Sequence, residues 1–254
     1  MTVPFENDTG NIVRKLARKS LKSEKRRNLM VVIAVALASC LICFSIVMAL
    51  STRQIEKNHV EDTYEAVYTK ITEEDVSSLK GLDDFSRVGE YYMLAVEPAE
   101  QGYNASYIYC DEETMYIARD QMKLLEGRLP QKEDEVVVSR YFLSNYGADA
   151  GIGEKVMLSS ESFHGEYTVT GIMEGYKEKE VNGTSILLSK EALKGWSGYD
   201  PADYRAYVHF KNEQQMDETE LTARSREIAK EYQLEMPVMY LSYMKFYKQP
   251  VNVS

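Results

Sequence analysis

The chain has 254 residues and a formal net charge of −10, from 30 Lys and Arg against 40 Asp and Glu. This charge is unevenly placed. Residues 1–28 hold eight basic and three acidic side chains, a net of +5, whereas residues 51–254 have a net of −15. An acidic region of this size repels the phosphates of nucleic acids, so the composition argues against nucleic-acid binding. The length allows one large domain or two small ones.

A run of 22 uncharged residues, LMVVIAVALASCLICFSIVMAL, separates the basic and acidic regions. As a helix rising ~1.5 Å per residue it would be about 33 Å long, which matches the ~30 Å hydrocarbon core of a lipid bilayer. We therefore predict a transmembrane helix over residues 29–50. Eight Lys or Arg precede it and only Arg53 follows closely. The positive-inside rule then predicts a protein of the cell (plasma) membrane, with residues 1–28 cytoplasmic and residues 51–254 extracellular or periplasmic.

Other interpretations of the apolar run fit its length and surroundings less well. A cleaved signal peptide has a shorter apolar stretch, of about 7–15 residues, and a shorter basic head than residues 1–28. The sequence LASC, which ends at Cys40, is similar to a lipoprotein processing site, but the residues after that cysteine stay mostly apolar. A buried core helix would normally be shorter and would have a polar face.

Two helical segments are expected on either side of the span. Residues 11–28 are predicted to form an amphipathic helix at the inner membrane surface, because apolar side chains recur at helical spacing and basic side chains occupy the other face. We expect these charges to anchor and orient the span rather than to contact a specific partner. Residues 51–70 are predicted to continue the span as a short helix, with a strand beginning near residues 64–71.

Helices and strands then alternate. We expect a helix that starts after an N-cap at Thr72 and stops at Gly81, since acids occupy its first turn. Residues 85–97 and 103–110 are rich in aromatic and β-branched side chains and are predicted strands. Residues 112–125 are predicted to be helical.

The stretch LLEGRLPQKEDEVVVSRYFLSNYG, residues 124–147, has the composition of a turn, a strand and a helix. Gly127 and Pro130 are expected to form the turn. The sequence EVVVS is expected to be a short buried strand. Ser139 is the expected N-cap of a helix that Gly147 ends.

Strands are also expected at GIGEKVMLS, EYTVTGIME and TSILLS, and Gly151 and Gly153 allow a tight bend at the first of them. Residues 204–212, 217–234 and 235–243 are predicted to form a strand, a helix and a strand, in a β-α-β unit. Residues 51–254 are therefore predicted to form one α+β domain, or two closely joined subdomains.

Five features in this order resemble the FtsX/MacB-like permeases of ABC transporters. The family has a basic N-terminal helix, a Gly-Arg-x-Pro turn, a strand from Glu to Ser, an Ile-Gly-acid-x-Val turn, and a strand ending in Val-x-Gly-Ile. Matching segments here are residues 11–28, 127–130, 135–139, 152–156 and 169–172. We expect the motif residues to be structural rather than catalytic; they are Gly127, Arg128, Pro130, Glu135, Gly151, Gly153 and Gly171. Glu135 and Arg128 either pair across the turn or face solvent.

The resemblance covers nearly the whole chain and implies one transmembrane helix followed by a MacB-type periplasmic core. It also implies a membrane permease subunit, or the N-terminal part of one. ATP hydrolysis by a separate cytoplasmic ABC ATPase subunit would move the external domain for export or signalling. Such permeases have four or more spans, and the sequence shows no second apolar run. The resemblance thus adds further permease spans, or a second permease chain, to the expected partners.

The alternative is a single-span membrane receptor or sensor with an extracellular ligand-binding domain. We expect no enzyme activity, catalytic residue, cofactor or metal site. No Gly-Lys dipeptide occurs, so a phosphate-binding loop that ends in Gly-Lys is absent. His59, His164 and His209 share no metal-ligand spacing, and GWSGY around Ser197 does not match a Gly-x-Ser-x-Gly elbow. The acid clusters are expected to cap helices or to face solvent.

Cysteines and tyrosines add two smaller expectations. Cys110 is the only cysteine outside the span, so we expect no disulfide framework. Several tyrosines fall on the two adjacent predicted strands, and they either line the core or form a recognition face. We favour the core; the residues concerned are Tyr91, Tyr92, Tyr103, Tyr107 and Tyr109.

Overall fold

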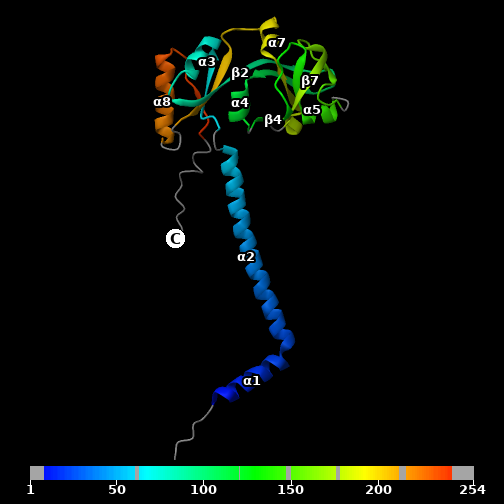
Figure 1. Cartoon of the computed structure of the whole chain (residues 1–254), viewed down its shortest axis with the longest axis vertical. Coiled ribbons are helices and arrows are strands. Elements are labelled where there is room, and N and C mark those ends of the chain that lie inside the picture. Colours follow the sequence, from blue (N-terminus) through cyan, green and yellow to red (C-terminus); the bar gives the residue numbers. More distant parts are fainter. Residues whose placement is uncertain are drawn as a thin grey trace, which may run out of the picture. The chain divides into compact units, whose positions relative to one another are not determined.

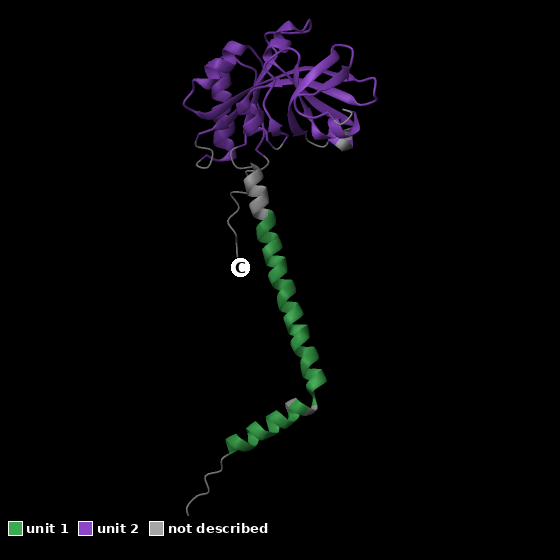
Figure 2. Ribbon diagram, turned by 45° about the vertical axis from the view of Figure 1, so that its right-hand side comes forward, with its two compact units in different colours: residues 1–58 green, residues 59–254 purple. Residues whose placement is uncertain are grey.

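The computed structural model describes residues 9–60, 63–119, 121–146, 150–175, 178–211 and 216–241. The chain divides into two compact units, residues 1–58 and residues 59–254 (Figure 2). The first unit is helical and the second is a mixed sheet with helices, so we describe each by itself (Figure 1).

The first unit contains α1 (Thr9–Ser23) and all but the last two residues of α2, which runs from Lys25 to Val60. On α1, Ile12, Val13 and Leu16 are exposed on an otherwise basic helix. The segment from Lys25 to Thr52 is long and apolar enough to cross a membrane, and none of the residues in its apolar window is buried. The expected helix over the apolar run is therefore present.

Polar side chains within this apolar helix bond to its own backbone. The hydroxyls of Ser39 and Ser45 donate to carbonyl oxygens one turn earlier, each at 2.8 Å. The hydroxyl of Thr52 does the same at 2.9 Å. Such bonds satisfy groups that a hydrocarbon environment leaves without water.

The second unit is built on one mixed sheet with the strand order β10-β1-β9-β2-β3-β8-β5-β7-β4, and β6 pairs with β7. The strands are β1 (Ala66–Ile71), β2 (Phe85–Pro98), β3 (Asn104–Cys110), β4 (Met122–Gly127), β5 (Glu135–Ser139), β6 (Lys155–Ser159), β7 (His164–Gly175), β8 (Gly183–Leu188), β9 (Tyr204–Phe210) and β10 (Val238–Met239). Pairs β3–β8 and β5–β7 are parallel, and the other pairs are antiparallel. The α+β class expected from the sequence is confirmed.

Short helices connect the strands, and most begin at a capped end. They are α3 (Glu73–Lys80), α4 (Glu112–Ile117), α5 (Arg140–Asn145), α6 (Glu178–Val181), α7 (Lys190–Gly195) and α8 (Glu218–Glu231). Thr72 and Asp75 form a capping box at α3, and the expected N-cap at Ser139 is confirmed, with its hydroxyl accepting from the Phe142 amide. Asp111 caps α4, so an acid of each expected cluster, residues 73–75 and 111–113, caps a helix, as expected. Gly147 lies outside the described residues.

One predicted element is wrong in its second half. Residues 112–125 were expected to be a single helix, but α4 ends at Ile117 and residues from Met122 onward form β4. β4 pairs with β7, where Met122 lies opposite Gly175 and is 7% exposed. Pairing and burial against a distant strand thus override the local helical preference.

The C-terminal β-α-β unit is present with two differences. β9, α8 and β10 follow one another as expected, but β10 is only two residues long and β1 lies between the two strands. The helix predicted to extend from residue 51 ends at Val60, and β1 begins at Ala66.

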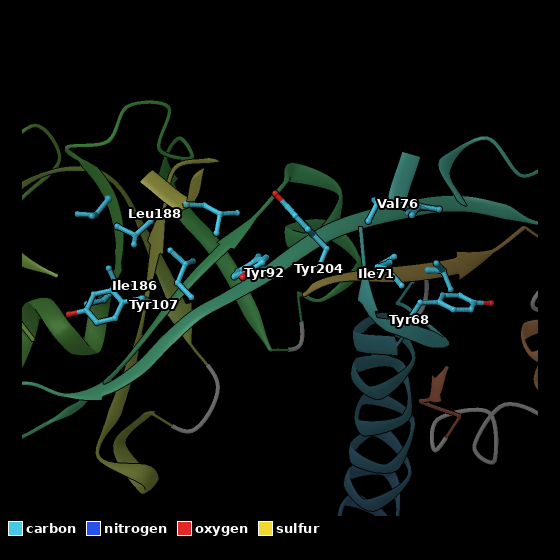
Figure 3. Packing of buried hydrophobic residues seen from close by; sticks show 14 of the residues in the cluster. Tyr68, Ile71, Val76, Tyr92, Tyr107, Ile186, Leu188 and Tyr204 are labelled. Carbon is cyan, nitrogen blue, oxygen red and sulfur yellow. The ribbon is translucent and has the colours of Figure 1, made fainter. Parts of the chain in front are cut away.

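Hydrophobic residues pack on both faces of the sheet. Neighbouring strand residues alternate between two buried clusters: Tyr107 belongs to one and Ile108 to the other, and the same holds for Ile186 and Leu187. Figure 3 shows the larger cluster, with Tyr68 at one end and Tyr107 and Leu188 at the other. The tyrosines singled out in the sequence are core residues: Tyr91, Tyr92, Tyr103 and Tyr107 are buried and Tyr109 is partly buried.

Candidate functional site

The family motif segments meet at the middle of β7. The Arg128 amide donates to Thr170 O at 3.0 Å, and the Gly153 amide donates to Val169 O at 2.8 Å. Glu135 lies opposite Thr168 in the β5–β7 pair. The turn at residues 127–130, the strand at residues 135–139 and the bend at residues 151–154 therefore meet at residues 168–170 of one strand.

Arg128 and Glu135 form a two-pronged ion pair within this arrangement. Arg128 Nη1 donates to Glu135 Oε2 at 2.8 Å, and Arg128 Nη2 donates to Glu135 Oε1 at 2.7 Å. The amides of Gln131 and Lys132 also donate to Glu135 Oε2, at 2.9 and 3.3 Å. The pair closes the turn that contains Pro130, so the sequence alternative in which these two side chains simply face solvent is wrong.

The electrostatics of Glu135 follow from these contacts. The Arg128 guanidinium, and then the Gln131 amide, favour the charged carboxylate and lower the pKa of Glu135 from 4.5 to about 2. The Glu135 side chain is 9% exposed and that of Arg128 is 50% exposed. An ion pair of this kind orders a turn and offers no proton for catalysis near neutral pH.

Two motif glycines allow close approach of β4 and β7. Gly127 lies opposite Gly171 in this pair. Gly127 has φ +84°, and a Cβ there would collide with the Thr170 carbonyl oxygen and lie 2.7 Å from Gly171 Cα. A Cβ on Gly171 would lie 2.8 Å from Arg128 O. Real Cβ atoms do not make such contacts, so both positions require glycine.

The other two motif glycines have more room. Gly153 has φ +87°, but nothing lies within 4 Å of the Cβ that it lacks. The Gly151 amide donates to Glu154 Oε2 at 2.7 Å. These residues shape the bend before β6, as expected from the sequence.

The described histidines, cysteine and acids do not assemble a metal-binding cluster. Among them no group of three or more His, Cys, Asp or Glu lies close enough to hold a metal ion. His164 is exposed, His209 is buried beside Glu65, and the side chain of His59 lies outside the described residues. Burial raises the pKa of the Cys110 thiol, which disfavours a reactive thiolate.

A surface pocket of about 500 Å³ lies beside β2 and the end of α3. Its charged lining residues are already paired. Arg87 Nη1 donates to Glu113 Oε2 at 2.7 Å, and Lys80 Nζ donates to Asp111 Oδ2 at 3.0 Å. The pocket therefore offers no unpaired catalytic pair within the described part of the chain.

A charged cluster that was not expected from the sequence links helices on different parts of the sheet. Lys190 of α7 donates to Glu90 Oε1 of β2 at 2.6 Å and lies 2.7 Å from Glu73 Oε1 of α3. Lys194 lies 3.0 Å from the other oxygen of Glu73. The two lysines lower the pKa of Glu73. Two lysines at four-residue spacing on α7 are a sequence signal for a charged cluster, but their acidic partners are about 100 residues away in the sequence.

Comparisons with known proteins agree with this architecture. A family model described as "MacB-like periplasmic core domain" matches residues 29–226. No curated protein matches the sequence. The periplasmic region of MacB from Actinobacillus actinomycetemcomitans has a similar structure, with 8% identity and a TM-score of 0.52; the match covers 76% of this chain and 97% of that one. The extracellular domain of the ABC-type transporter YknZ from Gram-positive bacteria matches at 15% identity and a TM-score of 0.49, over 70% and 100% of the two chains. The family model and the MacB structure confirm the expected MacB-type fold.

Substitution of Gly127 by Ala should destabilise the sheet domain more than substitution of Gly153 by Ala. Both glycines have positive φ, which costs an alanine about 1–2 kcal/mol. Only Gly127→Ala also forces β4 away from β7, at an additional cost of about 1–3 kcal/mol, typical of overpacking. Urea unfolding of the full chain in nanodiscs, followed by the fluorescence of Trp196, measures both. Equal losses would show that the close approach is unimportant.

The contribution of the Arg128–Glu135 pair should depend on pH. The folded-state pKa of Glu135, about 2, is below its ordinary 4.5, so the stabilisation is complete above about pH 4.5 and is lost as pH falls towards 2. Arg128→Gln should therefore lower the urea midpoint at pH 7 but not at pH 2. Lys155→Gln is the control, since it removes an exposed pair with Glu166. A difference that does not change with pH would contradict this account.

Proposed function

Because the chain belongs to the FtsX/MacB-like family of ABC transporter permeases, through its MacB-like periplasmic core domain, we propose that it couples ATP hydrolysis to movement of that domain. The proposed ATPase is a separate cytoplasmic ABC subunit. The movement serves export or signalling across the cell membrane. The chain acts as a permease subunit, or as the N-terminal part of one, together with further spans or a second permease chain.

The observation that supports this proposal best is the length of α2. The apolar run ends at Leu50, and the helix continues for ten more residues to Val60. At ~1.5 Å per residue this is a stiff extension of about 15 Å beyond the apolar segment. A continuous helix transmits displacement along its axis, whereas a flexible linker absorbs it.

The proposed orientation places α1 on the cytoplasmic side and the sheet outside. Basic residues on α1 and at the start of α2 favour a cytoplasmic position under the positive-inside rule. The exposed apolar side chains of Ile12, Val13 and Leu16 then lie on the inner membrane surface, where their burial is favourable. Domain boundaries at residues 28 and 50 belong to the same proposal.

The external domain contributes stiffness and shape to this function rather than chemistry. The chain belongs to a family of transporter permease components, and in this proposal it carries out no reaction of its own. The motif residues that the sequence highlights close turns and bring strands together around β7. We therefore assign the energy source to the partner ATPase.

A flexible insertion in α2 tests the proposal. Three glycines between Lys57 and Asn58 should abolish ATP-dependent movement of the external domain, because the helix can no longer transmit displacement. The three native cysteines are replaced, and spin labels are attached to cysteines introduced at residues 24 and 123. The measurement is the distance between the two labels in source-cell membranes, with ATP and with a non-hydrolysable analogue.

The control is the same insertion between Pro201 and Ala202, in an exposed turn. It should leave the ATP-dependent distance change intact. Both variants should keep the Trp196 fluorescence of the folded domain. An unchanged distance response after insertion in α2 would overturn the proposed coupling.

A further inference from the structure

Glu65 is a fully buried carboxylate at the point where the chain enters the sheet. It lies five residues after the last residue of α2 and one residue before β1, and its exposed fraction is 0%. Its Oε2 accepts a hydrogen bond from the Phe210 amide at 2.7 Å. Its Oε1 lies 2.7 Å from His209 Nδ1. Both carboxylate oxygens are thus bound to consecutive residues at the end of β9.

The backbone of Glu65 adds bonds to two strands. Its amide donates to Val208 O at 3.0 Å, and its carbonyl oxygen accepts from the Tyr240 amide at 2.7 Å. Val208 belongs to β9, and Tyr240 directly follows β10. One residue therefore joins the segment that enters the domain, a strand inside the sheet, and the segment that follows its last strand.

The neighbouring residue reinforces the same junction. The ring of Tyr64 packs edge-on against Tyr207 of β9 at 4.7 Å between centroids, and against Tyr240 at 4.9 Å. β10 is antiparallel to β1, with Ala66 opposite Met239. The segments before β1 and after β10 thus lie at the same end of the sheet.

A buried carboxylate is an expensive way to stabilise a fold. Desolvation of the charge offsets most of what its hydrogen bonds contribute, and an apolar residue of similar size often serves stability equally well. The carboxylate instead makes contacts that an apolar side chain could not make. The last backbone pair of β1 with β9 is Ala66 with Val208. The carboxylate bonds to the next two residues of β9, His209 and Phe210. The side chain extends the contact between the two segments past the end of the ladder.

This position is also where a load on β1 would act first. A pull on the chain before β1 would open the β1–β9 ladder from its Ala66–Val208 end, one hydrogen bond at a time. β9 itself is held on its other side by β2, from Phe85 to Tyr91. A load that reaches β9 therefore moves the sheet, whereas a load that stops at β1 only detaches one strand.

We propose that Glu65 is a positioning residue that clamps the segments before β1 and after β10 to β9, so that displacement along α2 moves the whole sheet instead of detaching β1. The proposal deepens the coupling function and rests on it. His209 acts as a partner of the clamp, and its burial follows from this role.

Hydrogen exchange in the full chain in nanodiscs tests the clamp without requiring ATP. Glu65→Ala should increase amide exchange in β1 and β10 by about tenfold or more, because it removes two buried hydrogen bonds. Glu178→Ala is the matched control. Glu178 is also buried, and its Oε1 accepts from Thr184 Oγ1 and the Ser185 amide at 3.0 and 3.1 Å, in the other half of the sheet. It should increase exchange around β8 and leave β1 protected.

The spin-label distance measurement with ATP then tests the role in coupling. Glu65→Ala should abolish the ATP-dependent change, and Glu178→Ala should retain it. Glu65→Gln, which keeps an acceptor for the Phe210 amide, should restore part of the response and serves as the variant of choice if the alanine form does not fold. A response of Glu65→Ala or Glu65→Gln equal to wild type would overturn the clamp.

The two proposals fail in different ways. If the wild-type chain shows no ATP-dependent change, the coupling function is wrong, and the clamp is then judged by hydrogen exchange alone. Unchanged protection of β1 in Glu65→Ala would overturn the clamp while the coupling function stands. Faster exchange equally in β1 and β8 would show general destabilisation and would also overturn it.

Discussion

The parallel pairing of β3 with β8 makes residues 59–254 one continuous sheet domain. It runs from Asn104 opposite Gly183 to Ile108 opposite Leu187, and it joins the strands from β10 to β3 with those from β8 to β4. Lys190 reinforces the same junction, since it bonds from α7 to β2 and α3. Backbone hydrogen bonds across a sheet resist shear, so displacement of one half reaches the other. Without this pairing, a push delivered at β1 would stop halfway across the domain.

The motif residues and Glu65 stabilise different parts of this sheet. Around β7, the Arg128–Glu135 pair and the facing Gly127 and Gly171 fix the far part of the sheet. At the other part, Glu65 fixes the segment through which the chain enters. Neither set of residues resembles a catalytic constellation. In the proposed function, both sets of residues keep the domain stiff.

Local patterns in the sequence predicted local structure well. The apolar run, the N-caps at Thr72 and Ser139 and the EVVVS strand are all set by residues within a few positions of one another. Features that depend on distant partners were missed or left open. The local sequence of β4 favours a helix, and its strand conformation depends on β7, which lies about 50 residues away. Glu65 is one of several acids in EDTYE, and no local feature distinguishes the one that becomes buried against residues 209 and 210. The alternative between a paired and a solvated Arg128 was likewise decided only by the fold.

The central claim is that this domain is driven by an ATPase on the other side of the membrane. The most direct measurement is affinity capture of the full chain from source-cell membranes, followed by an ATP hydrolysis assay and mass spectrometry of the complex. The account predicts an ABC ATPase in stoichiometric amount, with hydrolysis that is lost when its phosphate-binding lysine is replaced. Isolation of the chain with no nucleotide-hydrolysing subunit, together with ligand-dependent dimerisation of the chain, would contradict the account and favour a receptor.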